Sequence, residues 1–214
     1  MAFGSLSGEI ETMVIEVHAH TSEHYCCSRI SASDLIRIIQ EKGLGGVVLT
    51  DHHYLWSEEE LQQLRIDSDI ADDFLILSGQ EVFTRDFGDV LVFGAMETIP
   101  RGVTLSSIRE RHIDAAIVWA HPYRSGQVPM ETELFNAKLD AIEIINPRQK
   151  DWENNQGKTD WQTWGFIATS GSDIHDGSHS EFYPTCLKTE IKDIWGLVAS
   201  IRGGLCRPVV GKFI

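Results

Sequence analysis

Short apolar runs that end in histidine or a carboxylate recur along this chain, and they limit the folds open to it. The runs are 14–17 before His18 and His20, Gly46–Leu49 before Asp51 and His52, 74–77 before Glu81, 115–120 before His121, and 166–169 before Asp173 and His175. Buried strands that present polar side chains at their C-terminal ends build the active sites of barrels and of parallel α/β sheets. The pattern therefore predicts an α/β fold whose strands converge on one polar site.

Helical patterns separate these runs. Ser33 is predicted to cap a first helix that ends before Gly43, with an apolar face of Leu35, Ile36, Ile38 and Ile39. Ser57, followed by three glutamates, predicts a capping box at the start of a second helix. Further helices are predicted at 104–112 and 191–201, and strands at 89–94 and Ala141–Ile145. The strand at 89–94 is compatible with antiparallel pairing to 74–77, and segment 148–164 remains unassigned.

The strand count, about seven or eight, predicts a compact or irregular TIM-like barrel, because a full barrel of eight units usually needs about 250 residues. An open doubly wound sheet is the competing architecture. The chain of 214 residues is long enough for one sizeable core. We therefore expect a flexible N-terminal extension at residues 1–12 and a single domain at residues 13–214.

The formal charge of −14 disfavours attraction to long nucleic acids and to anionic membranes. It favours a small substrate and leaves a short oligonucleotide end possible. No run approaches the roughly 20 apolar residues of a membrane span, and residues 1–12 lack the pattern of a secretory signal. The four cysteines, Cys26, Cys27, Cys186 and Cys206, show no C-x-x-C spacing, which predicts reduced thiols in a cytoplasmic protein.

The polar residues after the runs have the chemistry of metal ligands. His18 and His20 stand two apart, so on a strand both rings face the same side, and Asp173 and His175 repeat that spacing. Each motif alone has an ordinary explanation, such as a turn histidine or a solvated acid. Imidazoles and carboxylates gathered from five segments together predict a transition-metal site.

In order and spacing, these segments resemble the motifs of the PHP (polymerase and histidinol phosphatase) family of metal-dependent phosphoesterases. The resemblance covers residues 15 to about 210. It rests on His18-Ala19-His20-Thr21, Leu49-Thr50-Asp51-His52, Gly79-Gln80-Glu81, Ala120-His121-Pro122 and Gly171-Ser172-Asp173-Ile174-His175. It implies a distorted (β/α)7 TIM-like barrel with a trinuclear metal cluster at the C-terminal ends of the strands.

By position, the resemblance implies that one ion is held by His18, His20, Glu81 and Asp173. Glu81 would bridge to a second ion completed by His121, and His52 and His175 would hold a third. We therefore expect two or three divalent ions of manganese, zinc or iron.

Two positions depart from the family pattern. The family often has a histidine or aspartate ligand a few residues after the H-x-H motif. Here His24 is the nearest candidate for that ligand, and Glu23 and Cys26 are the alternatives. Asp89 stands where the family often has histidine. Because a carboxylate is a harder ligand than an imidazole, Asp89 would favour Mn²⁺ or Fe²⁺ over Zn²⁺.

Other residues are candidates to act around the metals. Asp51 is a candidate to orient an imidazole, and Asn146 to contact substrate or a metal-bound water. Arg124 and Arg148 follow strand ends, and each is either a phosphate ligand or an ordinary surface arginine. His53 is either an acid at the site or a surface turn residue. The aromatic rings of Trp152, Trp161 and Trp164 are candidates for stacking on a substrate or for packing.

The predicted reaction is hydrolysis of a small phosphomonoester or a short, nucleotide-like phosphodiester. A hydroxide bridging two ions about 3.5–4 Å apart would attack phosphorus. Arg124 or Arg148 would stabilise the phosphoryl charge, and His53 would assist the leaving group. The alternatives are an amidohydrolase-like enzyme acting on C–N or C–O bonds and a non-catalytic metal-binding regulatory domain. The oligomeric state stays open.

Overall fold

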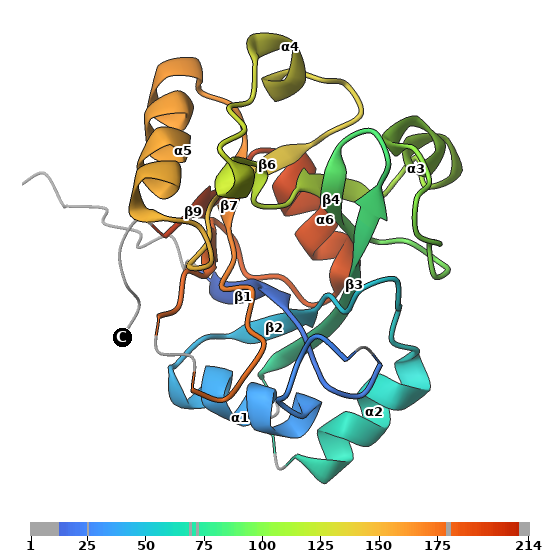
Figure 1. The fold of residues 1–214 in the computed structure, drawn as a ribbon. Helices are drawn as coiled ribbons and strands as arrows, with labels where there is room; N and C mark the ends of the chain where they lie inside the picture. Colours follow the sequence, from blue (N-terminus) through green and yellow to red (C-terminus); the bar gives the residue numbers. More distant parts are fainter. Residues whose placement is uncertain (1–12, 25, 69, 72, 179–180, 210–214) are drawn as a thin grey trace, which may run out of the picture.

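The computed structural model describes residues 13–24, 26–68, 70–71, 73–178 and 181–209. In this part of the chain, one nine-stranded sheet curls into a nearly closed barrel with helices around it (Figure 1). The strands are β1 (Met13–Ala19), β2 (Gly46–Leu49), β3 (Leu75–Thr84), β4 (Gly88–Phe93), β5 (Ala116–Trp119), β6 (Ala141–Ile145), β7 (Ala168–Ser170), β8 (Thr185–Leu187) and β9 (Cys206–Pro208). The helices are α1 (Ala32–Glu41), α2 (Glu58–Asp67), α3 (Leu105–Arg111), α4 (Glu131–Leu134), α5 (Asp151–Trp164) and α6 (Ile194–Arg202), with a 3₁₀ turn η1 (Pro122–Ser125).

Strand direction brings six strand ends to one rim of the barrel. The order in the sheet is β7-β6-β5-β4-β3-β2-β1-β8-β9. β1, β2 and β3 are parallel to one another, as are β5, β6 and β7, while β4 is antiparallel to both its neighbours. Because β4 is antiparallel to both β3 and β5, β3 and β5 run in the same direction. All six parallel strands therefore end at the same rim.

Hydrogen bonds of hydroxyl groups connect β7, at one end of the sheet, with β8 and with the residue after β9, at the other end. The Thr185 hydroxyl in β8 donates to the Ser170 carbonyl in β7 at 2.7 Å, and its oxygen accepts from the Ser170 amide at 3.1 Å. The Ser170 hydroxyl oxygen accepts from the Val209 amide at 3.1 Å. The barrel is thus closed at this point by hydroxyl groups in place of a ladder.

The predicted α/β barrel is confirmed, but it departs further from a regular series of seven βα units than expected. The described residues form nine strands, because β8 and β9 extend the sheet beyond β1 in antiparallel pairs. The antiparallel pairing of β3 with β4 is also confirmed. β3 is longer than the expected run at 74–77 and continues through Gly79, Gln80 and Glu81. The β4 partner strand keeps them extended through register pairs as far as Thr84.

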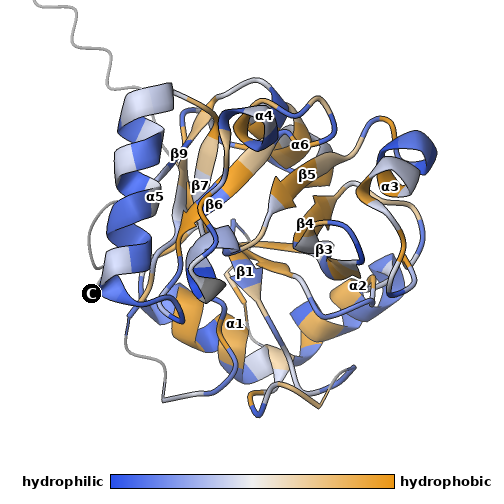
Figure 2. Ribbon diagram, turned by 45° about the horizontal axis from the view of Figure 1, so that its top comes forward, coloured by the Kyte–Doolittle hydropathy of each residue, from blue (hydrophilic) through white to orange (hydrophobic). Residues whose placement is uncertain are grey.

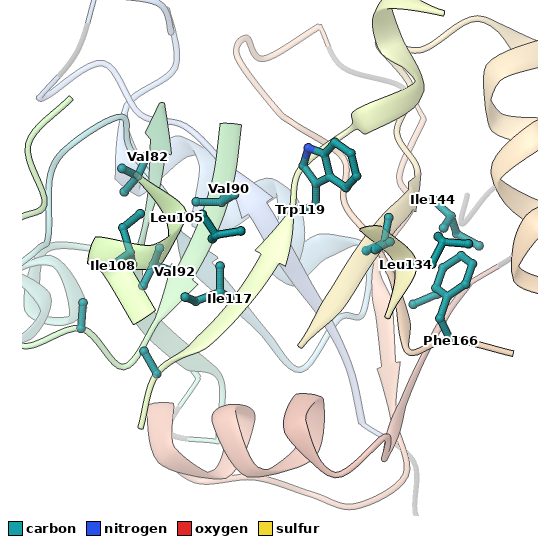
Figure 3. Packing of buried hydrophobic residues seen from close by; sticks show 14 of the residues in the cluster. Val82, Val90, Val92, Leu105, Ile108, Ile117, Trp119, Leu134, Ile144 and Phe166 are labelled. Atoms are coloured by element: carbon teal, nitrogen blue, oxygen red, sulfur yellow. The ribbon is translucent and has the colours of Figure 1, made fainter. Parts of the chain in front are cut away.

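Because alternate residues of a strand face opposite sides, β4 contributes to two apolar clusters. Val90 and Val92 pack with α3 residues Leu105 and Ile108 in the cluster of Figure 3. Leu91 and Phe93 pack instead with residues of β1, β2, β5 and α6. A third cluster places α1 and α2 against the other face of β1 to β3.

Of the four predicted helices, α2 and α3 start where the sequence indicates, and α1 and α6 do not. The α2 capping box is confirmed: the Ser57 hydroxyl oxygen accepts from the Glu60 amide at 3.3 Å, and the Glu60 carboxylate accepts from the Ser57 amide at 2.7 Å. α1 is capped by Ser31 and not by the predicted Ser33. Ser31 has the extended backbone of a cap and accepts from the Asp34 amide at 3.1 Å, while Ser33 lies in the first turn. α6 begins later than predicted, after the Asp193 cap.

The unassigned segment forms α5, a mainly polar helix (Figure 2). Its buried face includes Asn154, Gly157 and Asp160, so it lacks the apolar periodicity by which a helix is recognised from sequence. A Cβ atom on Gly157 would lie 2.6 Å from the carbonyl oxygen of Ile144, which requires glycine where α5 crosses β6. The predicted N-terminal extension lies outside the described residues. Among the described residues, no helix has the length and apolar character of a membrane span.

Candidate metal centre

The candidate site lies at the rim where the six parallel strands end. Its side chains are His18 and His20 at β1, His52 after β2, Glu81 in β3, His121 after β5, Asn146 after β6, and Asp173 and His175 after β7. Two isolated parallel bridges, Ala19 with Ile174 and His52 with Glu81, continue the sheet beyond the named strands. The backbone is thus paired on two sides of the cluster, between the end of β1 and the segment after β7 and between the segment after β2 and β3, and this pairing positions the side chains.

Glu81 lies at the centre of the cluster, with only 2% of its surface exposed. Its Oε1 atom is 2.9 Å from Nε2 of His121. Its Oε2 atom lies 3.0 Å from Nε2 of His20, 3.3 Å from that of His18 and 3.5 Å from that of His52. The two oxygens of one carboxylate thus face two different sets of imidazoles, as a bridging ligand requires.

Asp173 completes the inner cluster from the opposite side. Its Oδ1 atom lies 3.5 Å from Nε2 of His20 and 3.7 Å from Nε2 of His18. Its other oxygen pairs with the Arg124 guanidinium and accepts from Nδ2 of Asn146 at 3.3 Å. The ligand atoms therefore form two buried groups, and within each group they lie within 4.8 Å of one another. One group is His18, His20 and Asp173, and the other is His18, Glu81 and His121.

The inner groups hold their charges against burial. Burial lowers the pKa of His18, but the carboxylates of Glu143, Asp173 and Glu81 outweigh it and raise that pKa well above its ordinary value. Burial raises the pKa of Glu81, but His18, His121 and His20 outweigh it and hold that pKa well below its ordinary value. The carboxylates thus attract positive charge, which a divalent cation would supply in place of the His18 proton.

The outer histidines have the opposite tendency. Burial, reinforced by the neighbouring His20, lowers the pKa of His52 to about 4 and that of His175 to about 4. Both rings are therefore neutral at pH 7. A neutral imidazole keeps a lone pair on one nitrogen, which is the form that binds metals.

Hydrogen bonds at Nδ1 of His18 and His175 indicate which ring nitrogen a metal ion would bind. His18 Nδ1 lies 2.9 Å from a Glu143 oxygen, and His175 Nδ1 lies 2.9 Å from the carbonyl oxygen of Asp173. Because a carbonyl or carboxylate only accepts, Nδ1 carries the proton in each ring. Nε2 is then left as the ligand atom.

A third group lies beside the inner cluster. His20, Cys27, His52 and His175 each offer one ligand atom, and these atoms lie within 4.8 Å of one another. Burial and the negative charges of Asp51 and Glu81 raise the pKa of the Cys27 thiol to about 11, so Cys27 is not a thiolate nucleophile in the metal-free chain.

The structure places the other residues considered for this position elsewhere. His24 belongs to none of the three groups found among the described residues, because its ring stacks on Tyr54 at a centroid distance of 3.5 Å. The Glu23 carboxylate accepts from the Ala32 amide at 2.8 Å, and Cys26 is exposed.

Asp89 faces the same side of the sheet as Glu81. It pairs with Phe83 across the β3–β4 ladder, and Phe83 stands two residues from Glu81. Burial and the negative charge of Glu81 raise the pKa of Asp89. Asp89 therefore lies near the centre, although it belongs to none of the three close groups in the described chain.

Glu143 and Glu16, which were not predicted from the sequence, hold the cluster in place. Glu143, in β6, accepts from His18 Nδ1, and at 3.0 Å from both the His121 amide and Nδ2 of Asn146. Glu16, in β1, accepts at 2.9 Å from the amides of His18 and Ser172 and also from the Ser172 hydroxyl. The available signal was a single glutamate inside an otherwise apolar strand.

Asp51 and Asn146 contact the chain around the ligands. Asp51 accepts from the amide and hydroxyl of Thr21 at 2.6 and 2.7 Å, and from the Trp56 indole at 2.8 Å. It thereby fixes the backbone just after His20 and not an imidazole ring. Asn146 is held by Asn154, whose side chain accepts from the Asn146 amide and donates to its carbonyl.

The two arginines and His53 border the cluster. Arg124 pairs with Asp173, and its Nε atom has no hydrogen-bond partner among the described residues. Arg148 is exposed. His53 donates from Nδ1 to the Ile99 carbonyl at 3.2 Å, and burial lowers its pKa. Its buried Nε2 atom has no hydrogen-bond partner in the described part of the chain.

Backbone strain is concentrated at the site. His53, His121 and Asp173 have φ angles of 53°, 33° and 50°, and they are the non-glycine residues with positive φ in the described chain. Such conformations cost about 1–3 kcal/mol each and persist where the surroundings hold them. Here they direct side chains of the rim into the cluster.

The tryptophan segment and a cavity between α2 and α6 lie outside the cluster. Trp152 and Trp164 are exposed, and Trp161 packs against an apolar cluster. A cavity of about 520 Å³ lies between α2 and α6, lined partly by Trp56, Arg65 and Trp195, and none of the cluster ligands lines it.

The donor set fits divalent transition metals. Imidazole nitrogens and carboxylate oxygens converge at separations that a shared cation would bridge. His20 is fully buried, and its Nδ1 atom has no hydrogen-bond partner in the described residues. A buried polar atom without a partner is costly unless something else binds it.

Comparison with known proteins shows this fold in several solved structures. PsfC from Pseudomonas syringae PB-5123 matches with a TM-score of 0.69 at 14% identity, over 92% of this chain and 91% of that one. A two-domain protein from Bacteroides vulgatus, described as containing a predicted PHP-like metal-dependent phosphoesterase, matches with a TM-score of 0.69 at 14% identity, over 93% of this chain and 65% of that one. The fold of PHP-like phosphoesterases, expected from the motifs, is thereby confirmed.

The same fold also occurs in proteins with other substrates. A lesion-specific endonuclease from Pyrococcus furiosus matches with a TM-score of 0.58 at 14% identity, over 90% of this chain and 56% of that one. An amidohydrolase from Chromobacterium violaceum matches with a TM-score of 0.58 at 13% identity, over 87% and 96%. No family model matches the chain, and no curated protein matches it by sequence.

Proposed function

We propose that this protein is a metal-dependent phosphoesterase that hydrolyses a small phosphomonoester or a short phosphodiester. The observation that supports the proposal most directly is the position of Glu81, whose two carboxylate oxygens face His121 on one side and His18, His20 and His52 on the other. Two-metal hydrolases hold their ions about 3.5–4 Å apart, and a carboxylate whose two oxygens face separate ligand sets is placed to be shared by such a pair.

The ligands divide between the sites as follows. His18, His20, Asp173 and Glu81 would hold one ion, and Glu81 and His121 a second. His52 and His175 would contribute to a third, and Asp89 faces the same side of the sheet as Glu81. Divalent ions bound there would lower the pKa of a water molecule and withdraw charge from phosphoryl oxygens.

The residues at the border of the cluster would bind and orient the substrate. Arg124 is held at one end by Asp173 while its Nε atom keeps a free proton, so its guanidinium suits a phosphoryl oxygen. Because burial lowers the pKa of His53, its neutral ring is better suited to accept a hydrogen bond from a substrate hydroxyl than to supply a proton. Arg148, which is exposed, would contact the outer part of a substrate.

A small substrate is favoured by the charge of −14, which repels a long polyanion. A DNA lesion or end is the second candidate, because the chain shares its fold with a lesion-specific endonuclease. An amide or ester substrate is the third, because an amidohydrolase also has this fold.

A substrate panel tests the proposal. Purified protein would be assayed with added Mn²⁺, Zn²⁺ or excess chelator on p-nitrophenyl phosphate, bis-p-nitrophenyl phosphate, nucleotides, an abasic duplex, and p-nitrophenyl acetate with simple amides. We expect metal-dependent release from phosphate esters and its loss in Glu81→Gln, with Glu190→Gln as an exposed control. Turnover confined to acetate or amides, or no turnover by metal-loaded protein, would contradict the proposal.

A further inference from the structure

The loop after β1 holds Cys27 against two histidines of the centre. The Ser28 hydroxyl lies within hydrogen-bonding distance of the carbonyl oxygens of His20 (3.0 Å) and His175 (3.1 Å). The Arg29 amide donates to the same His175 carbonyl at 2.7 Å. The two residues that follow Cys27 are thus tied to the backbone that presents the imidazoles, so the position of the thiol is set by the fold.

The Cys27 sulfur lies among nitrogen ligands. Sγ and one ring nitrogen each from His20, His52 and His175 lie within 4.8 Å of one another. The rings of His52 and His175 both contact the His20 ring, at centroid distances of 4.8 and 4.4 Å respectively. A single cation placed among these atoms would meet a thiolate and at least two imidazoles.

A second observation also indicates a ligand at this place. Nδ1 of the fully buried His20 has no hydrogen-bond partner in the described chain. His175 keeps its lone pair on Nε2, because its Nδ1 atom donates to the Asp173 carbonyl. The His175 ring therefore has an acceptor nitrogen available to a cation, and the buried Nδ1 atom of His20 is the unpartnered polar atom beside it.

His24, the sequence-based candidate for this position, is directed away from it. Its ring stacks on Tyr54, meets the edge of Trp56 at 4.5 Å, and approaches Glu60 through Nε2 at 3.5 Å. These contacts place His24 beside α2. The neighbouring Cys26 is exposed, which makes it a matched control for Cys27.

We propose that Cys27 is a metal ligand and that, with His52 and His175, it forms a thiolate-containing site that favours Zn²⁺, Fe²⁺ or Co²⁺ over Mn²⁺ and Mg²⁺. The inference deepens the proposed function by naming the metal class of its third site. Soft thiolate and borderline imidazole ligands select these ions over hard ones. Binding converts the Cys27 thiol to a thiolate and releases its proton to solvent.

Cobalt spectroscopy tests the assignment without any substrate. Co²⁺ bound to a thiolate gives an intense sulfur-to-cobalt charge-transfer band in the near ultraviolet, whereas nitrogen and oxygen ligands do not. We expect the band in Co²⁺-loaded wild-type protein, its loss in Cys27→Ser with a fall of about one metal equivalent per chain, and its retention in Cys26→Ser and His24→Ala. A band of full height in Cys27→Ser, or no band in the wild-type protein, would overturn the proposal.

Alkylation of the unaltered chain gives a second reading if Cys27→Ser does not fold. Zn²⁺ is expected to slow iodoacetamide labelling of Cys27 at least tenfold, measured by peptide mass spectrometry, while Cys26 labels at the same rate with and without metal. Equal labelling of Cys27 in both conditions would reject the site. Because neither experiment measures turnover, its outcome is independent of whether phosphate esters are the substrates.

Discussion

Two buried glutamates show how single residues determine the geometry of the centre. Glu143 accepts three hydrogen bonds, from the His18 ring, the His121 amide and the Asn146 side chain. These donors belong to three different parts of the rim. Glu143 is therefore a positioning residue, which fixes the orientation of one ligand ring and the backbone of another.

The Glu143→Gln variant should bind metal more weakly while it keeps its fold. An amide in place of the carboxylate no longer stabilises the proton on His18 Nδ1 by charge, and loss of such a partner typically costs about 10–100-fold in metal affinity. Chelator competition would measure the dissociation constant, with Glu190→Gln as the control. Unchanged affinity with unchanged thermal stability would show that Glu143 has no positioning role.

Glu16 makes the stability of the metal-free protein depend on pH. Burial raises the pKa of its carboxyl from 4.5 to about 7, against hydrogen bonds from Ser172 and His18 that lower it. The folded state therefore binds a proton more tightly than the unfolded state. Protonation of Glu16 therefore stabilises the fold fully below about pH 4.5. This contribution to the free energy of unfolding, roughly 3 kcal/mol, is lost as the pH rises through 7.

The Glu16→Gln variant cannot lose this proton, so its free energy of unfolding should vary less between pH 5 and 8 than that of the wild-type protein. Urea denaturation in excess chelator at several pH values would measure the difference. Curves for the two proteins that stay parallel across this range would contradict the assigned pKa. Below pH 4.5, where both side chains are neutral, the two proteins should differ least.

At the scale of elements, the segment after β7 depends on the absence of a side chain at Gly171. A Cβ atom there would lie 2.2 Å from Oε1 of Glu143 and 2.5 Å from Cβ of His18. β7 can thus approach β1 and β6 closely enough to bring Asp173 into the cluster only with glycine at this position.

Gly171→Ala should therefore displace Glu143 or His18, weaken metal binding and destabilise the fold by about 1–3 kcal/mol, as overpacking does. Gly177→Ala is the matched control in the same loop, because its Cβ would meet only Ile30, at 3.9 Å. Calorimetry of both variants with and without Zn²⁺ would measure the effect. Equal behaviour of the two variants would show that the close approach at Gly171 is tolerated.

The elements that the sequence predicted are those with a strong local signal. Gly46–Leu49 and Ala141–Ile145 are uniformly buried runs, and their bounds agree with β2 and β6. α5 was not recognised because its buried positions are polar, and β8 and β9 are only three residues each.

The candidate site was predictable to a similar degree. Strand direction brings His18, Glu81, His121 and Asp173 to one rim, and their motifs lie at the ends of the apolar runs that the sequence shows. The choice between His24 and Cys27 depends on the hydrogen bonds of Ser28 and Arg29 to a loop almost 150 residues away. Spacing along the chain contains no information about that contact.

At the scale of the whole molecule, metal binding should contribute much of the stability. Several acidic and imidazole groups are buried together at one rim, and a cation that binds only the folded state stabilises it by about 2.7 kcal/mol at one hundred times its dissociation constant. For a chain of this size, each kcal/mol of added stability raises the Tm by roughly 2–4 °C.

Removal of metal by a chelator should lower the Tm, and added Zn²⁺ or Mn²⁺ should restore it. Differential scanning calorimetry would measure the shift, with Mg²⁺ and K⁺ as weaker-binding controls. The Glu81→Gln variant should show a much smaller shift. A Tm that does not change with transition metals would indicate that the cluster is not a metal centre.

The contact between Asp173 and β1 also sets an order of events during protein synthesis. The Asp173 amide donates to the His18 carbonyl at 2.7 Å, so the first strand of the barrel is completed by a residue near the other end of the chain. While a ribosome is still making β6, the nascent chain already contains His18, His20 and Glu81, but the fourth side of their cluster does not yet exist. An ion at the inner site would therefore meet its full set of ligands only after the segment that follows β7 has been made and has docked on β1.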